Sequence, residues 1–591
     1  MLSSERLSPA NDLFPVMVSR TAWLCLGGAL AGALIAAISG GQSSELPKYQ
    51  LMFQDAPVLL LLGLCPLAAA RWLKTDDGLL SGGSLERLAR WRFVWVIAAL
   101  AACLTYVGTF IVYRHFAVSF DEFLAEFDAT SIASGHLITP VAAEWRDYVQ
   151  ALQPMLMLKV PGGEYWASAY LPVNAAIRAF FMHLGDQAIA GPVLAAVALL
   201  AVFGVARRLW PKRPDAALVA TLLLACSPQF LMTAMTPYAM TAHLALNLIW
   251  LWLFLRDTRT SHALAVCVAF AACGLHQVVF HPLFAVPFLL TVVRDRRWKL
   301  AAFYAAAYGA ICMFWIRYWT LLLHSVAPPE VQPAAAGIAN LLRHIENMVE
   351  HDLLATIPHV GLLLFRFVAW QSPLLVPLAL VGFIACRRQN TTIRDLALGV
   401  ALTAGVLFLL VPFQGHGWGY RYLHGLLGSA SLLAAQGWIV LTGRAGTMRR
   451  QTNLLAASLC VSLLVMFPWH AYQVRKFIAP YWSATQAIAR SDAQVVVIDP
   501  IDVWYAIDLT RNDPLLRNSP KVMALGNLDP EKLARLCRSY DVAIFGRREA
   551  DRHGLEIEDS AVTSPEAFRA YSELRQILAS LNCGRPMSAA R

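Results

Sequence analysis

Apolar segments long enough to cross a lipid bilayer recur along most of this 591-residue sequence. A helix needs about 20 mainly apolar residues to cross roughly 30 Å of hydrocarbon, and 58% of the residues are hydrophobic whereas 15% are charged. We therefore predict a polytopic α-helical membrane protein with about thirteen transmembrane helices. The predicted spans are 21–40, 55–72, 92–113, 188–206, 216–234, 239–255, 262–278, 279–293, 300–323, 373–387, 395–412, 423–442 and 454–472.

Positive charge is concentrated in short loops between these spans. When the spans are counted, the basic clusters all fall on one side, which the positive-inside rule makes cytoplasmic. Topology thus accounts for the net charge of +10 without a nucleic-acid partner. We predict a multi-pass protein of the cell inner (plasma) membrane, with a cytoplasmic N-terminus. The clusters are 71–92, 207–213, 256–259, 294–299, 387–394 and 444–450.

Three segments are too long to be turns between spans: 114–187, 324–372 and 473–591. All three are predicted on the outer, periplasmic or exoplasmic, side. In the last segment, β-branched runs ("AQVVVIDP", "KVMAL", "DVAIFG") alternate with an amphipathic stretch, "DPEKLARLCRSY", which indicates a small α/β domain.

The predicted organisation has three parts. Residues 1–91 carry two additional spans, residues 92–472 form the main transmembrane domain with its outer loops, and residues 473–591 form the extracytoplasmic α/β domain. No glycine-rich fingerprint follows the predicted strands, so a nucleotide-binding Rossmann unit is unsupported. Two of the eleven cysteines, Cys537 and Cys583, follow the last span; a disulfide and two free thiols fit the sequence equally well.

The stretch "SFDEFLAEFD" (119–128) places four carboxylates directly after an apolar span. Its apolar residues recur at i, i+3, i+4 and i+7, which predicts a helix with one aromatic face, lying in the membrane interface. One interpretation makes Asp121 and Glu122 part of the wet face of this helix. The other makes them functional, because a carboxylate held near a hydroxyl or amine can act as a general base.

A second unusual stretch, "FQGHGWGYRYLHGLL" (413–427), lies at the outer end of a late span. Its glycines let the backbone approach a ligand closely, and Arg421 lies on the side that the positive-inside bias disfavours. The structural interpretation is an aromatic-belt anchor with a snorkelling arginine. The functional interpretation is a guanidinium that binds a phosphate, with Tyr420 beside it.

Histidines within or beside the predicted spans form a third set. Ionisable groups inside a membrane suggest function, although a buried histidine is often simply hydrogen-bonded to a neighbour. His276 and His281 are five residues apart, which is not the i, i+4 spacing of a helical metal site. We assign His243, His276 and Tyr170 to a candidate substrate cavity; the residues leave open whether a divalent metal takes part.

The order of these motifs resembles the GT-C membrane glycosyltransferases, in particular the branch of the protein mannosyltransferases and aminoarabinose transferases. The resemblance covers about 92–445. It rests on the Asp-Glu pair after a span, then "ASGHLITP", then "YWASAYLPVNAAIRAFFMHLGDQAIAGPVLAAVALLAVFGVARRLW", a Ser-Pro turn, and "GWGYRYLHGLLGSASLLAAQG".

The resemblance implies transfer of a sugar from a polyprenyl-phosphate carrier to a lipid, glycan or protein acceptor on the outer face, usually with inversion. It implies that Asp121 is the general base, that Glu122 supports it, and that Arg421 binds the donor phosphate. Lys159 is added to the phosphate site on charge grounds. Two features depart from the family pattern: two spans precede the one before Asp121, and His243 stands where some relatives have a second acid.

Two other classes of protein compete with a glycosyltransferase. A transporter or flippase of lipid-linked saccharides would favour inverted repeats and polar residues near the midplane, and neither is evident in the sequence. A membrane scaffold acting through 473–591 would leave the acids at 121–128 unexplained.

Overall fold

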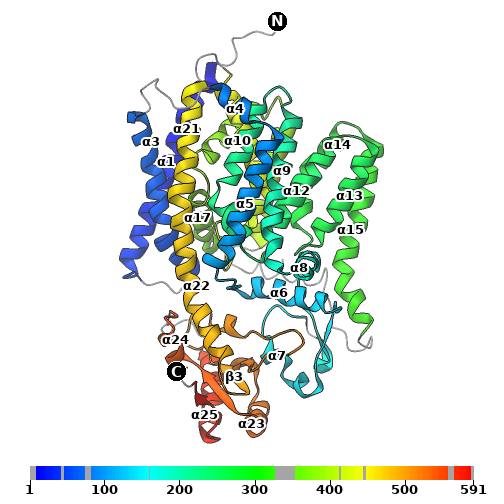
Figure 1. Cartoon of the computed structure of the whole chain (residues 1–591), viewed down its shortest axis with the longest axis vertical. Coiled ribbons are helices and arrows are strands. Elements are labelled where there is room, and N and C mark those ends of the chain that lie inside the picture. Colours follow the sequence, from blue (N-terminus) through cyan, green and yellow to red (C-terminus); the bar gives the residue numbers. More distant parts are fainter. Residues whose placement is uncertain are drawn as a thin grey trace. The chain divides into compact units, whose positions relative to one another are not determined.

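The computed structural model describes residues 8–41, 45–72, 82–158, 160–326, 353–410, 414–443, 448–556 and 565–587 (Figure 1). The chain divides into two compact units. The first comprises Met1–Gly108, Ile189–Ile316 and Gly337–Tyr472, and the second comprises Thr109–Ala188, Arg317–Ala336 and Gln473–Arg591. We describe each unit by itself.

The first unit consists of apolar helices. Its helices, three of which (α5, α15 and α22) continue into the second unit, are α1 (Ser8–Ile38), α2 (Leu46–Tyr49), α3 (Ala56–Trp72), α4 (Gly82–Leu88), α5 (Trp91–Ile111), α9 (Ala190–Leu209), α10 (Pro214–Ala225), α11 (Pro228–Ala234), α12 (Met240–Phe254), α13 (Arg259–Cys273), α14 (Phe280–Arg294), α15 (Trp298–His324), α17 (Leu353–Ala369), α18 (Leu375–Cys386), α19 (Thr391–Leu410), α20 (Leu427–Leu441), α21 (Met448–Val461) and α22 (Phe467–Ala489).

Seven helices among the described residues are long and apolar enough to cross a membrane, and α10 with α11 makes an eighth if that bent pair is one span. Five shorter apolar helices accompany them. The prediction of a polytopic α-helical membrane protein is confirmed, whereas the predicted number of thirteen spans stays a prediction.

Small residues let the helices of this unit pack closely. Gly382 of α18 faces the backbone of Leu433 in α20, and Gly437 of α20 faces the backbone of Leu378 in α18, so a Cβ at either glycine would collide with main-chain atoms. Helices associate in this way where lipid removes the hydrophobic driving force between them. Between α10 and α11 the chain bends by 59°, and the Ser227 hydroxyl caps the new helix by accepting from the Phe230 N–H.

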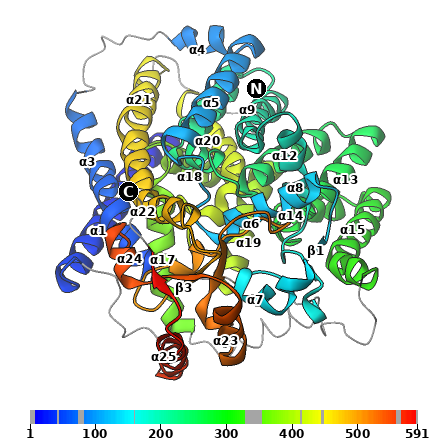
Figure 2. The ribbon, with the colours of Figure 1, turned by 60° about the horizontal axis from the view of Figure 1, so that its bottom comes forward.

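The second unit contains the predicted α/β region. Strands β3 (Val495–Ile498), β4 (Lys521–Ala524), β5 (Val542–Phe545) and β6 (Arg585–Pro586) form a parallel sheet in the order β4-β3-β5-β6. The three strands predicted from the sequence are present, and so is the helix between two of them, α23 (Pro530–Ser539). Helices α24 (Arg547–Arg552) and α25 (Pro565–Ser580) complete this region, and α23 and α25 lie beside β3 (Figure 2).

The segment 109–188 belongs to this same unit. It forms α6 (Phe120–Ala133), α7 (Val149–Leu152), α8 (Val173–His183) and the short strands β1 (Thr139–Pro140) and β2 (Tyr165–Trp166). One hydrophobic core joins α6 to the sheet, with Phe127, Trp166 and Val497 among its buried residues. The predicted division into 1–91, 92–472 and 473–591 stays a prediction.

The aromatic face of α6 differs from expectation. We predicted that this face lies in the membrane interface, but Leu124 and Phe127 are buried in the core of the second unit and Phe123 packs against that core. Phe127 meets Trp166 edge-on, with ring centroids 5.2 Å apart. A 3.6-residue period marks an apolar face without telling whether protein or lipid covers it. Protein covers this face, and the position of α6 at the membrane interface stays a prediction.

The cysteine alternatives left open by the sequence are resolved in this unit. Cys537 at the end of α23 and Cys583 after α25 form a disulfide. The bond ties together two helices that also pack against each other.

Candidate active site

Helix α6 begins with a capping box. The Ser119 hydroxyl accepts from the Glu122 N–H, and the Glu122 carboxylate accepts from the backbone N–H groups of Val118 and Ser119 at 2.6 and 3.2 Å. This arrangement satisfies donors that the first turn of a helix leaves without partners. Glu122 is fully buried, and burial raises its pKa to about 7. The Glu122 side chain thus fixes the start of α6, in the same turn that carries Asp121.

Asp121 is half-buried at the first turn of α6. The Tyr170 hydroxyl donates a hydrogen bond to Asp121 Oδ1. The two residues are 49 positions apart, and the sequence predicts different roles for them, Asp121 as the base and Tyr170 as part of the substrate cavity. The structure brings these two candidates together, so that a phenol orients the carboxylate predicted to be the base.

The other acids of this stretch have partners in the same unit. The Ser168 hydroxyl donates to Asp128, whose pKa is raised to about 7 by burial. Burial also raises the pKa of Glu126, while the nearby guanidinium groups of Arg178 and Arg511 act in the opposite direction. These acids therefore each have polar or charged neighbours from the same unit. Among the described residues, no group of three or more His, Cys, Asp or Glu side chains could hold a metal ion.

In the first unit, Arg421 follows a loop whose backbone conformation favours glycine at three positions. Gly415, Gly417 and Gly419 have φ values of +64°, +145° and +66°, a region that other residues rarely adopt. A Cβ at Gly417 would lie 2.7 Å from Arg421 Cδ, and one at Gly419 would collide with the Gln229 side chain. The glycines therefore allow both the turn and the close approach of these side chains.

A buried ion pair holds this loop. Arg366 and Asp55 are 2% and 1% exposed, and Arg366 Nη1 lies 3.0 and 2.9 Å from the two carboxylate oxygens. The same guanidinium donates to the carbonyls of Gly417 and Gly419, at 2.9 and 3.1 Å. Trp370 Nε1 also donates to Asp55, at 2.7 Å. Each lone pair and proton of a buried charge needs such a partner.

Two amides complete the loop. Gln414 donates to the Gly419 carbonyl and accepts from the Arg421 N–H, at 3.0 and 3.1 Å, while Gln229 donates to the Tyr420 carbonyl at 2.9 Å. The sequence interpretation missed Asp55 and Arg366, which stand 311 positions apart. Both residues could have been noticed, because Asp55 is a charged residue at the start of an apolar stretch and Arg366 is a charged residue within one.

The Arg421 side chain is 7% exposed. Its guanidinium carbon lies 5.1 Å from the ring centroids of both Tyr238 and Tyr422, and Nη2 lies 3.3 Å from the Tyr422 hydroxyl. A snorkelling arginine keeps its charge in water, so this burial favours the functional interpretation. The ring of Tyr420, a further candidate, packs against Tyr422 with centroids 6.5 Å apart.

A small cavity connects Arg421 with His243. Asn247, Phe280 and Thr403 also line it. His243 is 4% exposed, and neither of its ring nitrogens has a hydrogen-bond partner in the part of the chain that the structure describes. This pair of candidates is thus brought together within the first unit.

The remaining candidates fall elsewhere. His281, a metal-ligand candidate in the sequence, forms hydrogen bonds with Asn247 and Tyr308 at 2.8 and 2.9 Å. His276 is half-buried with its ring 6.2 Å from Phe280. Lys159 lies outside the described residues. Asp121 and Arg421 belong to different compact units, so their predicted cooperation stays a prediction.

Comparison with known proteins gives matches at the level of structure. No protein-family model matches the sequence, and no curated protein matches it. Two crystal structures of ArnT from Cupriavidus metallidurans are similar, each with a TM-score of 0.46 and 12% identity. The structure bound to undecaprenyl phosphate matches 72% of this chain and 85% of its own, and the apo structure matches 76% and 91%. The chain is thus similar in structure, over most of its length, to ArnT of that organism.

Proposed function

We propose that this chain is an integral-membrane glycosyltransferase that moves a sugar from a polyprenyl-phosphate carrier to an acceptor on the extracytoplasmic side. The observation that carries the proposal is the contact between Asp121 and Tyr170. A half-buried carboxylate oriented by a phenol is a suitable general base, and it lies in the segment whose motif order resembles the GT-C enzymes.

In the proposed reaction, Asp121 accepts the proton of an acceptor hydroxyl or amine. The acceptor oxygen or nitrogen then bonds to the anomeric carbon of the sugar, and the bond from that carbon to the phosphate oxygen breaks. The electron pair of the broken bond leaves with the lipid phosphate. Attack from the face opposite the phosphate inverts the anomeric configuration.

Arg421 is assigned to the departing phosphate, whose negative charge grows as the bond breaks. A guanidinium matches phosphate oxygens through parallel N–H donors, and a fixed cation in a water-poor site stabilises developing charge strongly. The loop that carries Arg421 is held by Arg366, Gln414 and Gln229, so little reorganisation accompanies the reaction.

A lipid-borne donor suits the predicted side of the membrane. Nucleotide sugars are cytoplasmic, whereas the candidate base is predicted outside, and the sequence has no glycine loop that would cradle a nucleotide phosphate. The Cys537–Cys583 disulfide in the same unit as Asp121 supports this side, because such bonds persist in oxidising compartments.

The test is turnover of purified protein with a panel of polyprenyl-phosphate sugars, measured as lipid phosphate freed. Asp121→Asn is expected to lower turnover by about 10²-fold or more, as loss of a general base does. Asp551→Asn, at an exposed position of the same unit, serves as the matched control and retains wild-type turnover. Full activity of folded Asp121→Asn would overturn the base, and no release by the wild-type protein from any donor would overturn the function.

A further inference from the structure

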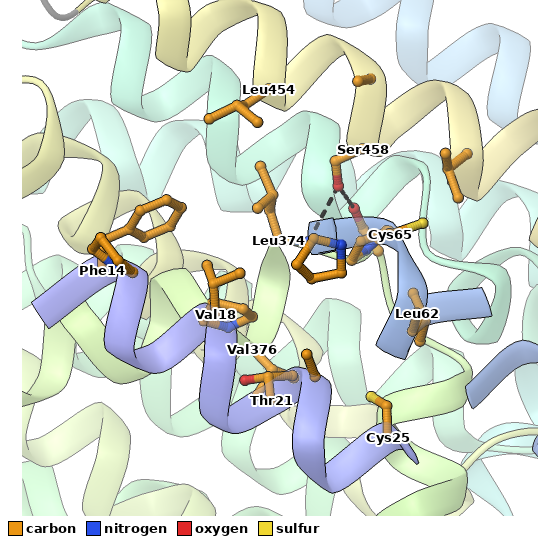
Figure 3. A pocket seen from close by; sticks show the side chains of 18 of the residues that line it. Phe14, Val18, Thr21, Cys25, Leu62, Cys65, Leu374, Val376, Leu454 and Ser458 are labelled. Atoms are coloured by element: carbon orange, nitrogen blue, oxygen red, sulfur yellow. Dashed lines mark hydrogen bonds between the residues drawn. The ribbon is translucent and has the colours of Figure 1, made fainter. Parts of the chain in front are cut away.

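A second cavity of the first unit does not include Arg421 in its lining. It is an apolar groove of about 710 Å³ between α1, α3, α18 and α21. Figure 3 shows Phe14, Val18, Thr21 and Cys25 of α1 along one side and Leu454 and Ser458 of α21 along the other. We call it the α1–α21 groove.

Most of this groove is suited to hydrocarbon. Its polar side chains along the middle are already satisfied: Thr21 donates to the Met17 carbonyl at 2.8 Å, and Ser458 pairs with the Ser372 hydroxyl at 3.0 Å and accepts from the Leu374 N–H at 3.1 Å. The side-chain oxygen of Gln451, which has no hydrogen-bond partner among the described residues, lies next to Arg450 at one end of the lining. An apolar space whose polar side chains are satisfied does not hold ordered water. In a bilayer, a chain of lipid fills such a space.

The length of the groove matches one leaflet. On α1 the lining runs from Phe14 to Cys25, and on α21 it runs from Arg450 to Val461. At 1.5 Å of rise per residue, each stretch is about 16 Å long, which is about half of the roughly 30 Å hydrocarbon core. A single acyl chain has this reach, whereas a long polyprenyl chain exceeds it.

Charge is confined to one end. Among the described residues that line the groove, Arg450 is the charged one. It is exposed and lies next to Gln451 in the first turn of α21. It belongs to the basic cluster 444–450, which the positive-inside rule places at the cytoplasmic surface. Basic pockets between helices at that surface suit anionic lipid headgroups.

We propose that the α1–α21 groove is a binding site for an anionic glycerophospholipid of the cytoplasmic leaflet, with one acyl chain in the groove and the phosphate beside Arg450. This site is distinct from the proposed donor site, which is assigned to the other side of the membrane. The proposal does not depend on the proposed function.

The test uses the full-length protein in nanodiscs of equal phosphatidylglycerol and phosphatidylcholine with matched chains. After detergent washing, the lipid retained per protein is counted by native mass spectrometry. We expect one retained lipid, with phosphatidylglycerol favoured about fivefold, the factor that one basic residue supplies at such a surface. Arg450→Gln should bring the two lipids to parity. Arg388→Gln, at another exposed arginine of a basic cluster, should not.

A second pair of variants tests the groove itself. Ala457→Phe fills the groove and should abolish retention, whereas Cys460→Phe, at an exposed position outside the groove on the same helix, should preserve it. Val18→Trp fills the same space from α1. A loss of lipid that both variants share therefore cannot be attributed to misfolding of α21. Equal retention in wild type and both filled variants overturns the proposal. So does retention of added polyprenyl phosphate in place of phospholipid, or a dimer that Ala457→Phe dissociates.

Discussion

At the scale of single residues, Arg421 combines burial with a fixed backbone. Its side chain lies against Tyr238 and Tyr422, and its own N–H is bound by Gln414. Lysine keeps the charge at such a position but loses the planar fork, so the exchange is not conservative.

For Arg421→Lys we expect donor turnover to fall about tenfold or more, and for Arg421→Ala about 10²- to 10³-fold, which is the usual cost of removing a group that stabilises transition-state charge. The loss should appear mainly in kcat, because the charge on the phosphate grows as the bond breaks. The measurement is steady-state release of lipid phosphate, with Arg388→Lys as control. An unchanged kcat in Arg421→Ala would exclude the assigned role.

Some residues of the candidate site can be predicted from the sequence and others cannot. Asp121 follows an apolar span, Arg421 is predicted on the side of the membrane where basic residues are disfavoured, and His243 lies within an apolar span. Each is unusual for its position and can therefore be identified from the sequence. The partners Asp55 and Arg366 cannot be paired from the sequence, because only the fold brings together residues 311 positions apart.

At the scale of elements, α6 shows how one helix uses its acids for several purposes. Glu122 caps the helix, Asp128 accepts from Ser168, and Asp121 accepts from Tyr170. The periodicity predicted the helix and its apolar face correctly but not what covers that face. The capping role of Glu122 is local, but the roles of Asp121 and Asp128 depend on Tyr170 and Ser168, which are 40 or more positions away. Spacing within the helix does not indicate these distant partners.

Asp128 makes the stability of the fold depend on pH, and the direction of this dependence follows from its raised pKa. The pKa of Asp128 is raised from 3.8 to about 7, so the folded state binds a proton that the unfolded state has already lost. This contribution to stability is complete below about pH 4 and disappears as the pH rises through about 7.

Asp128→Asn remains neutral at every pH. We therefore expect the variant to be more stable than wild type at pH 8, by a few kcal/mol, with a smaller difference at pH 5. Thermal unfolding of the purified protein at the two pH values measures this difference. The control is Asp147→Asn, because the Asp147 side chain is 58% exposed; this substitution should change stability little at either pH. An effect of Asp128→Asn that is the same at both pH values would contradict the argument.

At the scale of the whole molecule, hydropathy and charge predicted the class of fold, because a bilayer imposes helix length and loop charge directly. Hydropathy did not predict that the segment 109–188 and the α/β region share one core. That association rests on side-chain packing between distant parts of the chain, which composition does not encode.

The disulfide is the covalent link of this second unit. It closes a loop with a sequence separation of 46, and removal of such a link commonly costs about 2–4 kcal/mol. We expect Cys537→Ser with Cys583→Ser to lower the thermal unfolding midpoint, and reductant to lower that of the wild type to the same value. Serine at Cys103 and Cys460, both exposed and free, should have little effect.

The glycine loop beside Arg421 has a consequence for the history of this protein. Gly417 and Gly419 have no room for a methyl group, and their carbonyls are both bound by one guanidinium. A lineage could not exchange these three residues one at a time without passing through a damaged intermediate. We therefore expect relatives that lack Arg366 to differ at Gly417 and Gly419 as well.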